Sequence, residues 1–287
     1  MYNILVTGSD GQLGSEIREI SSKYLNYNFF FTDVKYLDIT DHKAALMFIE
    51  SNKINVIINC AAYTAVDKAE SEPELSNAIN HLAVANFAQI AKDKNIKLVH
   101  ISTDYVFDGI KYKPYVESDK PNPQSVYGQT KLNGELAMQM INPPNSVIIR
   151  TSWLYSKYGN NFIKTMLRLA KVKDEISIVS DQIGSPTSAT DLAQVILNIL
   201  PKIKNETIEL FHYSNEGVCS WYDFAKSIFE IKDVNIKLKP INTEQYPTSS
   251  RRPFYSVMNK SKIKDSFKLE IPYWKNSLVE SLKNKSY

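Results

Sequence analysis

Short apolar runs rich in β-branched residues alternate with longer segments whose apolar residues recur every three or four positions. The short runs predict strands, and the longer segments predict amphipathic helices. Because the runs are apolar without interruption, the strands should be covered on both faces. Strands are expected at residues 3–7, 27–32, 56–60, 97–102 and 146–150, and helices at 11–24, 43–51, 74–93 and 125–140. This alternation predicts right-handed βαβ units, and so an α/β fold of the Rossmann type: a doubly wound parallel sheet over residues 1–150.

The pattern is less regular after residue 150. Helices are expected at 162–170, 189–200 and 220–229, and short strands at 176–180, 208–213 and 236–240. We interpret residues 151–287 as a smaller mixed α/β lobe that mainly binds substrate and can return segments to the first domain. The stretch 108–124 is long for a loop in a compact domain, which is typical of a lid or a recognition loop.

Composition excludes several classes of function. Hydrophobic residues make up 43% of the chain, charged residues 23%, and the net charge is +3, as in an ordinary globular protein without a strong pull toward nucleic acid. Four distant histidines and two cysteines offer neither zinc-ligand spacing nor a disulfide framework. No apolar run approaches the roughly 20 residues of a membrane span, and the first residues do not resemble a secretory leader. We therefore expect a cytoplasmic protein without a membrane or nucleic-acid partner.

A glycine-rich segment follows the first strand and opens the first helix. Gly8, Gly11 and Gly14 lie in the sequence GSDGQLG, with Gln12 and Leu13 between the last two. Glycine lets the backbone turn sharply and approach a pyrophosphate, and the helix N-terminus offers unpaired N–H groups to the phosphates. This segment predicts a dinucleotide site; the alternative is a glycine turn with only a packing role.

Residues at later strand ends extend this site. Asp33 comes 19 residues after Gly14, where an acid is expected to meet the adenosine ribose and favour NADH. Lys35, two residues further, would instead pair with the 2′-phosphate of NADPH, so both cofactors remain open. The adenine and the nicotinamide-side ribose should be flanked by Asp38, Ile39, Ala62, Tyr63 and Thr64.

A tyrosine and a lysine four residues apart form the candidate catalytic pair. Tyr127 and Lys131 share one face of the expected helix, where the ammonium should lower the pKa of the phenol and suit it as a proton donor. Chance alone gives one or two such pairs in this chain, and Tyr222 with Lys226 is a second, which we interpret as an amphipathic helix face. Thr103 distinguishes the first pair, because it ends the fourth strand, where such sheets place ligands. Its hydroxyl is expected to hold a substrate carbonyl beside Tyr127.

Three further residues are candidates for substrate contact. Trp153 follows the fifth strand, where it forms either the wall of a crevice or part of the core. Asn161 supplies an amide to the substrate or caps the following helix. Arg252, one of an adjacent pair of arginines before a proline, matches a nucleotide diphosphate through its guanidinium, with a surface ion pair as the alternative.

Several longer motifs resemble the dTDP-4-dehydrorhamnose reductases, a family of the extended short-chain dehydrogenase/reductases. The resemblance covers essentially the whole chain, and its most specific parts are STDYVFDG and DQIGSPT. The other matching segments are GSDGQLG, NCAAYTAVDKAE, Tyr127 with Lys131, RTSWLY and Arg252 with Pro253.

The resemblance implies a role for each matching residue. Tyr127 matches the family's proton donor, Lys131 the lysine that lowers its pKa and holds the nicotinamide ribose, and Thr103 the hydroxyl that polarises the ketone. Asp104 and Trp153 match substrate contacts. Members reduce the 4-keto group of a dTDP-linked 4-keto-6-deoxy sugar, dTDP-4-dehydro-L-rhamnose, with NADPH or NADH. Some bind Mg²⁺ at a dimer contact through acids that include one in the first helix, here Glu16, so Mg²⁺ and a homodimer are further expectations.

Two alternatives remain open at this point. One is a non-catalytic, NADP-binding regulatory subunit of the same superfamily, although a regulatory subunit has no need of the set Thr103, Tyr127 and Lys131. The other is a reductase of a different nucleotide-linked keto-sugar, because no residue of the sequence identifies the base directly.

Overall fold

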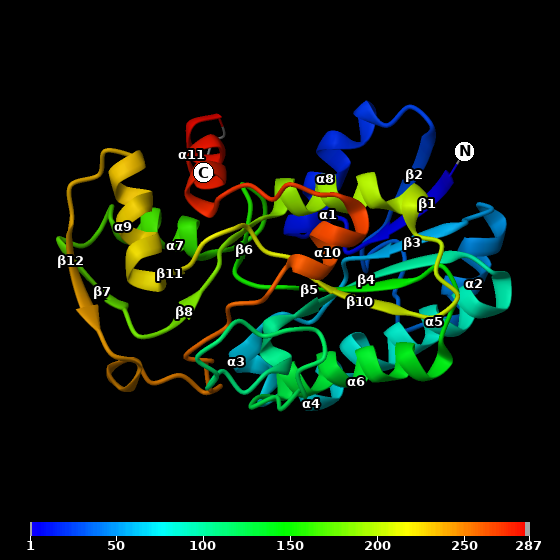
Figure 1. Ribbon diagram of the computed structural model, residues 1–287, viewed down its shortest axis with the longest axis horizontal. Helices are drawn as coiled ribbons and strands as arrows, with labels where there is room; N and C mark the ends of the chain where they lie inside the picture. The colour runs from blue at the N-terminus through cyan, green and yellow to red at the C-terminus, as the bar shows by residue number, and fades with distance from the viewer. Residues whose placement is uncertain (1, 285–287) are drawn as a thin grey trace.

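A parallel sheet of six strands forms the centre of the described part of the chain, residues 2–284, in the computed structural model (Figure 1). Its order is β10-β5-β4-β3-β1-β2, and every neighbouring pair is parallel. The strands are β1 (Tyr2–Thr7), β2 (Tyr27–Phe31), β3 (Val56–Asn59), β4 (Lys97–Thr103), β5 (Val147–Thr151) and β10 (Glu209–His212). The continuous apolar runs thus form the central strands of a doubly wound sheet, as the sequence predicts.

Helices cover both faces of this sheet (Figure 1). One face is packed by α1 (Gln12–Ile20), α8 (Ala189–Ile199) and α10 (Ser261–Phe267), which meet around Ile4, Val6 and Ile149. The other face is packed by α2 (His42–Ser51), α5 (Ala83–Lys94) and α6 (Val126–Ile141). Alternate residues of each strand enter the two layers, which is why the strand sequences are apolar without interruption.

The helix expected at 74–93 is divided in the structure. It consists of α4 (Pro73–Asn77), a π-helical turn over Ala78–Leu82, and α5. In this turn the side chain of Asn80 bonds both the N–H and the carbonyl of Tyr63, which fixes the loop after β3. Apolar periodicity does not detect such a turn, because one extra residue changes the spacing only locally. The short helix α3 (Val66–Ala69) lies in the same loop.

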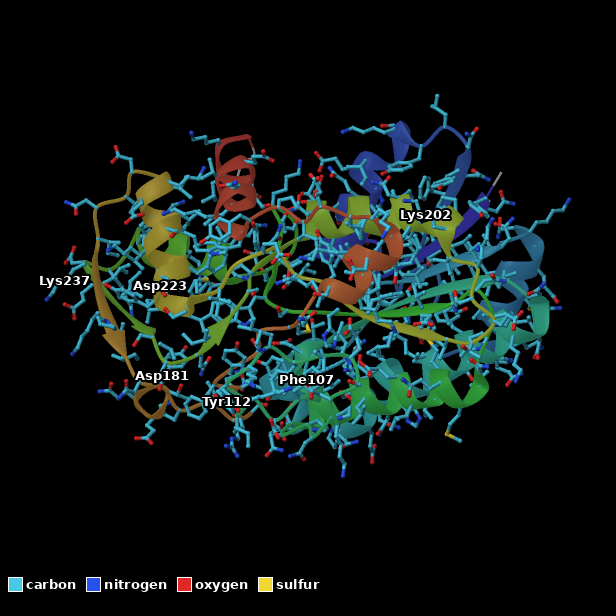
Figure 2. The ribbon with its side chains drawn as sticks, in the orientation of Figure 1. Phe107, Tyr112, Asp181, Lys202, Asp223 and Lys237 are labelled. Carbon is cyan, nitrogen blue, oxygen red and sulfur yellow. The ribbon has the colours of Figure 1, made fainter. Side chains whose placement is uncertain are left out.

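The second half of the chain forms a lobe beside the sheet and also returns one strand and two helices to the first domain (Figure 1). In the lobe, α7 (Phe162–Leu169), α9 (Trp221–Ile231) and α11 (Trp274–Asn284) share a core with β7 (Glu175–Val179). The strand β12 (Lys237–Ile241) pairs with β7, and Figure 2 shows Lys237 at the outer edge. Strand β10, in contrast, belongs to the six-stranded sheet, and helices α8 and α10 pack on one face of that sheet. Strand β10 lies at one edge of that sheet.

Smaller elements complete the lobe and the loops. The short strands are β6 (Leu154–Tyr155), β8 (Ile183–Gly184), β9 (Thr187–Ser188) and β11 (Cys219–Ser220), and single 3₁₀ turns occur at Ser21–Lys23, Asp104–Val106, Leu200–Lys202 and Thr243–Gln245. Tyr222 packs against the lobe core from α9, as its amphipathic pattern predicts. Within residues 2–284, none of the helices has both the length and the apolar character that crossing a bilayer requires.

Candidate active site

A cleft of about 640 Å³ opens where the parallel strands end. Its wall includes residues from the segments that follow β1, β2 and β3, and from the ends of β4 and β5. In that order they include Gly8, Asp33, Cys60, Thr103 and Thr151. The edge formed by strand C-termini is where open α/β sheets bind ligands, because the chain turns there from strand to helix and leaves a crevice.

The glycine-rich turn forms one end of the cleft. Gly8 has φ +61°, and a Cβ there would lie 2.7 Å from Ala61 of the neighbouring loop. No side chain caps α1 at Gly11, so the N–H groups of its first turn face the cleft unshielded, an arrangement that suits a phosphate. Gln12 and Leu13 also line the cleft. Gly14 lies inside α1, behind the cleft wall, where it packs against Gly8 and Ser9.

Asp33, Asp38 and Ile39 line the same end of the cleft. The Asp33 carboxylate accepts hydrogen bonds from the backbone N–H groups of Asp10 (3.1 Å) and Val34 (2.8 Å), so it is tied to the glycine-rich turn. These contacts place a fixed carboxylate where an adenosine ribose is expected.

The loop after β3 contributes Ala62 and Thr64 to the cleft wall. The side chain of Tyr63 does not join them: its hydroxyl bonds Glu72, and its backbone is held by Asn80. Tyr63, which the sequence places beside the cofactor with these two residues, is therefore not part of the cleft wall.

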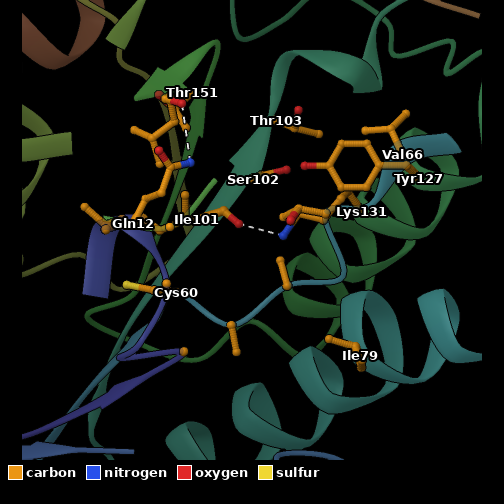
Figure 3. Close-up of a pocket in the computed structure, with 18 of the residues that line it drawn as sticks. Gln12, Cys60, Val66, Ile79, Ile101, Ser102, Thr103, Tyr127, Lys131 and Thr151 are labelled. Carbon is orange, nitrogen blue, oxygen red and sulfur yellow. Dashed lines mark hydrogen bonds between the residues drawn. The ribbon is translucent and has the colours of Figure 1, made fainter. Parts of the chain in front are cut away.

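Thr103, Tyr127 and Lys131 come together at the centre of the cleft (Figure 3). The Tyr127 ring points its hydroxyl toward Ser102 and Thr103 at the end of β4. Thr103 Oγ1 also donates to Asp104 Oδ1 at 3.0 Å. Helix α6 thus presents a phenol to the end of β4, so two hydroxyls can reach one oxygen atom of a ligand.

Local sequence explains how α6 reaches β4 so closely. Ser125 caps α6 by accepting a hydrogen bond from the Gly128 N–H at 3.0 Å. A Cβ at Gly128 would lie 2.3 Å from the Tyr105 carbonyl oxygen, so only glycine allows this approach. The residue that follows Tyr127 therefore controls the distance between Tyr127 and Thr103.

The electrostatics of the pair differ from the expectation. Burial raises the pKa of Tyr127, and the neighbouring Thr103 hydroxyl opposes this only in part. Burial also lowers the pKa of Lys131 to about 8, against the raising effects of Glu135 and Cys60. Lys131 Nζ donates to the Ile101 carbonyl at 2.6 Å instead of facing the phenol. The prediction that Lys131 lowers the pKa of Tyr127 is wrong for the free protein, because a shared helix face does not fix where a long side chain ends. Tyr127 is a neutral phenol at neutral pH, the state that donates a proton.

Asp104 is a buried carboxyl beside the hydroxyl pair. Burial raises its pKa to about 7, although hydrogen bonds from Thr103 and Ser256 act to lower it. No hydrogen bond of ordinary geometry reaches its Oδ2 atom. Since a buried polar atom without a partner is costly, Asp104 Oδ2 is suited to receive a ligand hydroxyl.

Trp153 also lines the cleft and has an unusual backbone, with φ +49°. Its indole stacks on Trp221, with ring centroids 3.6 Å apart and planes 9° apart. Backbone strain of this kind persists where surrounding contacts hold it, here the stacked indole of Trp221 and the close approach of Gly184. The result is a flat apolar wall opposite the hydroxyl pair.

Asn161 and Arg252 lie outside this cleft wall. Asn161 caps α7 by accepting from the Lys164 N–H at 3.2 Å, and its amide holds the Gln12 side chain. The capping alternative is therefore the one that the structure shows; Gly159 and Asn160 line the cleft in its place. Arg252 borders a small separate hollow, where it forms an ion pair with Asp67 and donates to the Tyr105 hydroxyl at 3.2 Å.

The Mg²⁺ expectation finds no support. Glu16 is 1% exposed, and its carboxylate accepts hydrogen bonds from Ser156 (2.6 Å) and Thr190 (2.9 Å). Among residues 2–284, no group of three or more histidine, cysteine or acidic side chains is arranged to hold a metal ion. The position of Glu16 on the inner face of α1 explains this: it joins the helix to the second half of the chain.

Sequence reasoning missed several residues of the cleft wall, among them Val66, Ile79, Ser102 and Thr151. Ser102 and Thr151 lie at strand ends, and this position alone could have identified them. Val66 and Ile79 belong to the loop and the π-helical turn after β3, for which the sequence carries no local signal.

The fold and the cleft define a Rossmann-type α/β protein of the short-chain dehydrogenase/reductase class. A crystal structure of dTDP-glucose 4,6-dehydratase from Bacillus anthracis in complex with NAD has the same fold, with a TM-score of 0.81 at 19% identity over 99% of this chain and 96% of that one. Residues 2–286 match the family model described as RmlD substrate binding domain.

The chain belongs to the dTDP-4-dehydrorhamnose reductase family. It is 40% identical to the reductase of that name from Aggregatibacter actinomycetemcomitans, over 97% of both chains. Crystal structures of two further relatives of that name superpose closely. The one from Clostridium acetobutylicum has a TM-score of 0.93 and 44% identity, covering 98% of this chain and 99% of the other. The one from Bacillus anthracis, in complex with NADP, has a TM-score of 0.94 and 38% identity, covering 99% and 100%.

Proposed function

We propose that this protein reduces the 4-keto group of dTDP-4-dehydro-L-rhamnose to give dTDP-L-rhamnose, with NADPH as the reductant. The observation that carries the proposal is that the side chains of Thr103 and Tyr127 meet at the centre of the cleft, beside buried Lys131. Family membership and full-length similarity to reductases of that name support the same substrate.

The cleft residues fit a dinucleotide. The turn at Gly8 and Gly11 lets a pyrophosphate approach the backbone, and the first turn of α1 supplies N–H donors and a partial positive charge. Asp33 takes the adenosine ribose, with Asp38 and Ile39 beside the adenine, while Ala62 and Thr64 border the nicotinamide side. Lys131 supplies a cation beside the nicotinamide ribose. The cofactor supplies the hydride when it is bound.

The Asp33 carboxylate on its own favours NADH, and Lys35 supplies the positive charge that the 2′-phosphate of NADPH requires. Lys35 is exposed in the turn just after Asp33, so its ammonium can reach a 2′-phosphate without being desolvated. The relative crystallised with NADP points the same way.

The chain's own residues prepare the ketone for reduction. Thr103 turns its proton from Asp104 to the substrate oxygen, and Tyr127 donates from the other side. Two donors fix the carbonyl and stabilise negative charge as it develops on oxygen. Tyr127 then gives its proton to that oxygen, for which its neutral state is required.

The remaining substrate contacts follow from the cleft wall. Trp153 offers a face to the sugar ring, and Asp104 Oδ2 accepts from a sugar hydroxyl. Arg252 pairs with the Asp67 carboxylate through one edge of its guanidinium. Its other N–H groups contribute to binding of the substrate diphosphate. We propose a cytoplasmic location, because Cys60 and Cys219 are free thiols. A homodimer remains a proposal from the family resemblance.

A coupled set of assays tests the function. NADPH consumption is followed with dTDP-4-dehydrorhamnose, with its UDP-linked counterpart, and with NADH in place of NADPH. We expect turnover with the dTDP sugar and a lower kcat/KM for the UDP sugar. Binding of NADPH without consumption of any keto-sugar would instead indicate the regulatory subunit.

A further inference from the structure

Three buried polar side chains form a ladder beneath Lys131. Thr7, Asn59 and His100 are register partners on the adjacent strands β1, β3 and β4, so their side chains leave the same face of the sheet. Thr7 Oγ1 donates to Asn59 Oδ1 at 2.7 Å, and Asn59 Nδ2 lies 3.2 Å from His100 Nδ1. The ladder ends at the catalytic helix, where His100 Nε2 lies 3.3 Å from Lys131 Nζ.

The ladder is fully buried, and its histidine is neutral. Thr7, Asn59 and His100 are 0%, 1% and 0% exposed, and burial together with the Lys131 charge lowers the pKa of His100 well below its ordinary value. Buried polar groups destabilise a fold unless they are paired, and three of them in an otherwise apolar layer call for a functional reason. Reduction of a ketone by Tyr127 and Thr103 makes no direct use of them.

Hydrogen-bond chemistry links the ladder to the proton on Lys131. A neutral imidazole has one donor nitrogen and one acceptor nitrogen. In the observed arrangement Asn59 Nδ2 donates to His100 Nδ1, so the imidazole hydrogen is on Nε2 and suits the neutral amine of Lys131. With the carboxamide turned over, Asn59 accepts from Nδ1, and Nε2 accepts from the ammonium. Thr7 serves both arrangements, because a hydroxyl both donates and accepts.

We propose that the Thr7–Asn59–His100 ladder is a positioning element for Lys131, which holds its amine at the cofactor cleft and, through the hydrogen bond of His100, sets how firmly that amine keeps its proton. His100 is the positioning residue that contacts Lys131, and Asn59 determines which polarity His100 adopts. This inference rests on the proposed contact between Lys131 and the cofactor.

Other ionisable groups around Lys131 act separately from the ladder. Glu135 is one helical turn further along α6 and favours the ammonium, but Arg150 of β5 pairs with it. Cys60, after β3, is a neutral thiol because burial raises its pKa to about 12. Tyr127 is a neutral phenol on the same helix. The ladder is therefore the neutral side-chain group at Lys131 whose histidine can either donate to its amine or accept from its ammonium.

The test measures NADPH affinity against pH in the full-length protein, by quenching of tryptophan fluorescence. In the wild type the affinity should fall as pH rises through the pKa of Lys131, near 8, because the ammonium is lost. We call the pH midpoint of this fall the break. Asn59→Asp can only accept from His100 and adds a negative charge, so the break should move to higher pH by about half a unit or more. His100→Leu removes the acceptor from the ammonium without admitting a charge, so the break should move downward by a similar amount.

Two controls make the result decisive. His212→Leu makes the same change at another buried neutral histidine, which contacts Arg150 and the Tyr115 carbonyl instead of Lys131, and it should leave the break in place. Lys131→Met should abolish the break. If the break stays at the wild-type pH in both Asn59→Asp and His100→Leu, or moves in the same direction in both variants, the role of the ladder is overturned. The proposed function would still stand. If Lys131→Met still shows a break at the wild-type pH, both the proposed contact of Lys131 with the cofactor and the inference built on that contact are overturned.

Discussion

Substituting Glu135 by Gln should destabilise the protein strongly, because it breaks an ion pair that solvent does not reach. The Glu135 and Arg150 side chains are 1% and 3% exposed. Arg150 donates to the carboxylate through Nε at 2.9 and 3.2 Å and through Nη2 at 2.6 Å, and Ser102 donates from the end of β4. The pair thus joins α6 to β4 and β5, and its loss disturbs the elements that carry the hydroxyl pair.

The expected loss is about 3–5 kcal/mol, since Glu135→Gln leaves the Arg150 charge buried without a counter-charge. For a protein of this size this corresponds to a fall in Tm of roughly 10 °C. Urea denaturation followed by circular dichroism measures the free energy of unfolding directly. Glu50→Gln is the matched control: its partner Lys94 is exposed, so the loss should be at most about 1 kcal/mol.

A double variant tests the reasoning behind this magnitude. Glu135→Leu with Arg150→Met removes both charges, and it should be more stable than Glu135→Gln, because no buried charge is left unpaired. A Glu135→Gln protein within about 1 kcal/mol of the wild type, or a double variant less stable than the single one, would refute the assignment of the cost to an uncompensated charge.

Two further predictions concern the cleft wall. The carboxyl of Asp104 keeps its proton to about pH 7 in the folded protein, whereas its ordinary pKa is 3.8, so the folded state binds more protons between these values and stability falls as pH rises through this window. Asp104→Asn should remove this pH dependence of the free energy of unfolding, which totals roughly 4 kcal/mol at most. Urea denaturation between pH 4 and 8 measures it, and an unchanged pH dependence would show that another group causes it. Trp221→Leu removes the stacking partner of Trp153 and should raise KM for the sugar nucleotide about fivefold while leaving the NADPH Kd unchanged. Equal effects on both ligands would contradict a role confined to the sugar.

The central sheet and the grouping of the candidate site residues in one cleft could be predicted from the sequence for a physical reason. Strands buried on both faces are continuously apolar, and parallel strands place their C-terminal residues along one edge, so Gly8, Asp33 and Thr103 were assigned to one cleft from their positions alone. The Tyr127–Lys131 spacing became informative only with Thr103, because such pairs also occur by chance.

The remaining features depend on contacts between distant segments. Nothing around His100 marks it as more than a strand residue, and its role appears only when β1, β3 and β4 align in register. Glu16 has the residue type of a metal ligand, but the hydroxyls of Ser156 and Thr190 occupy its carboxylate. The pKa of Tyr127 likewise depends on its burial in the folded protein, which a four-residue spacing does not report.

The most direct test of the account is the rate of hydride transfer in Tyr127→Phe, measured in a single turnover with NADPH and dTDP-4-dehydrorhamnose. The variant keeps the ring and the shape of the cleft but lacks the proton. We predict NADPH binding at the wild-type Kd and a rate lower by about 10²–10⁴-fold. Hydride transfer at the wild-type rate would contradict the assignment of Tyr127 as the proton donor.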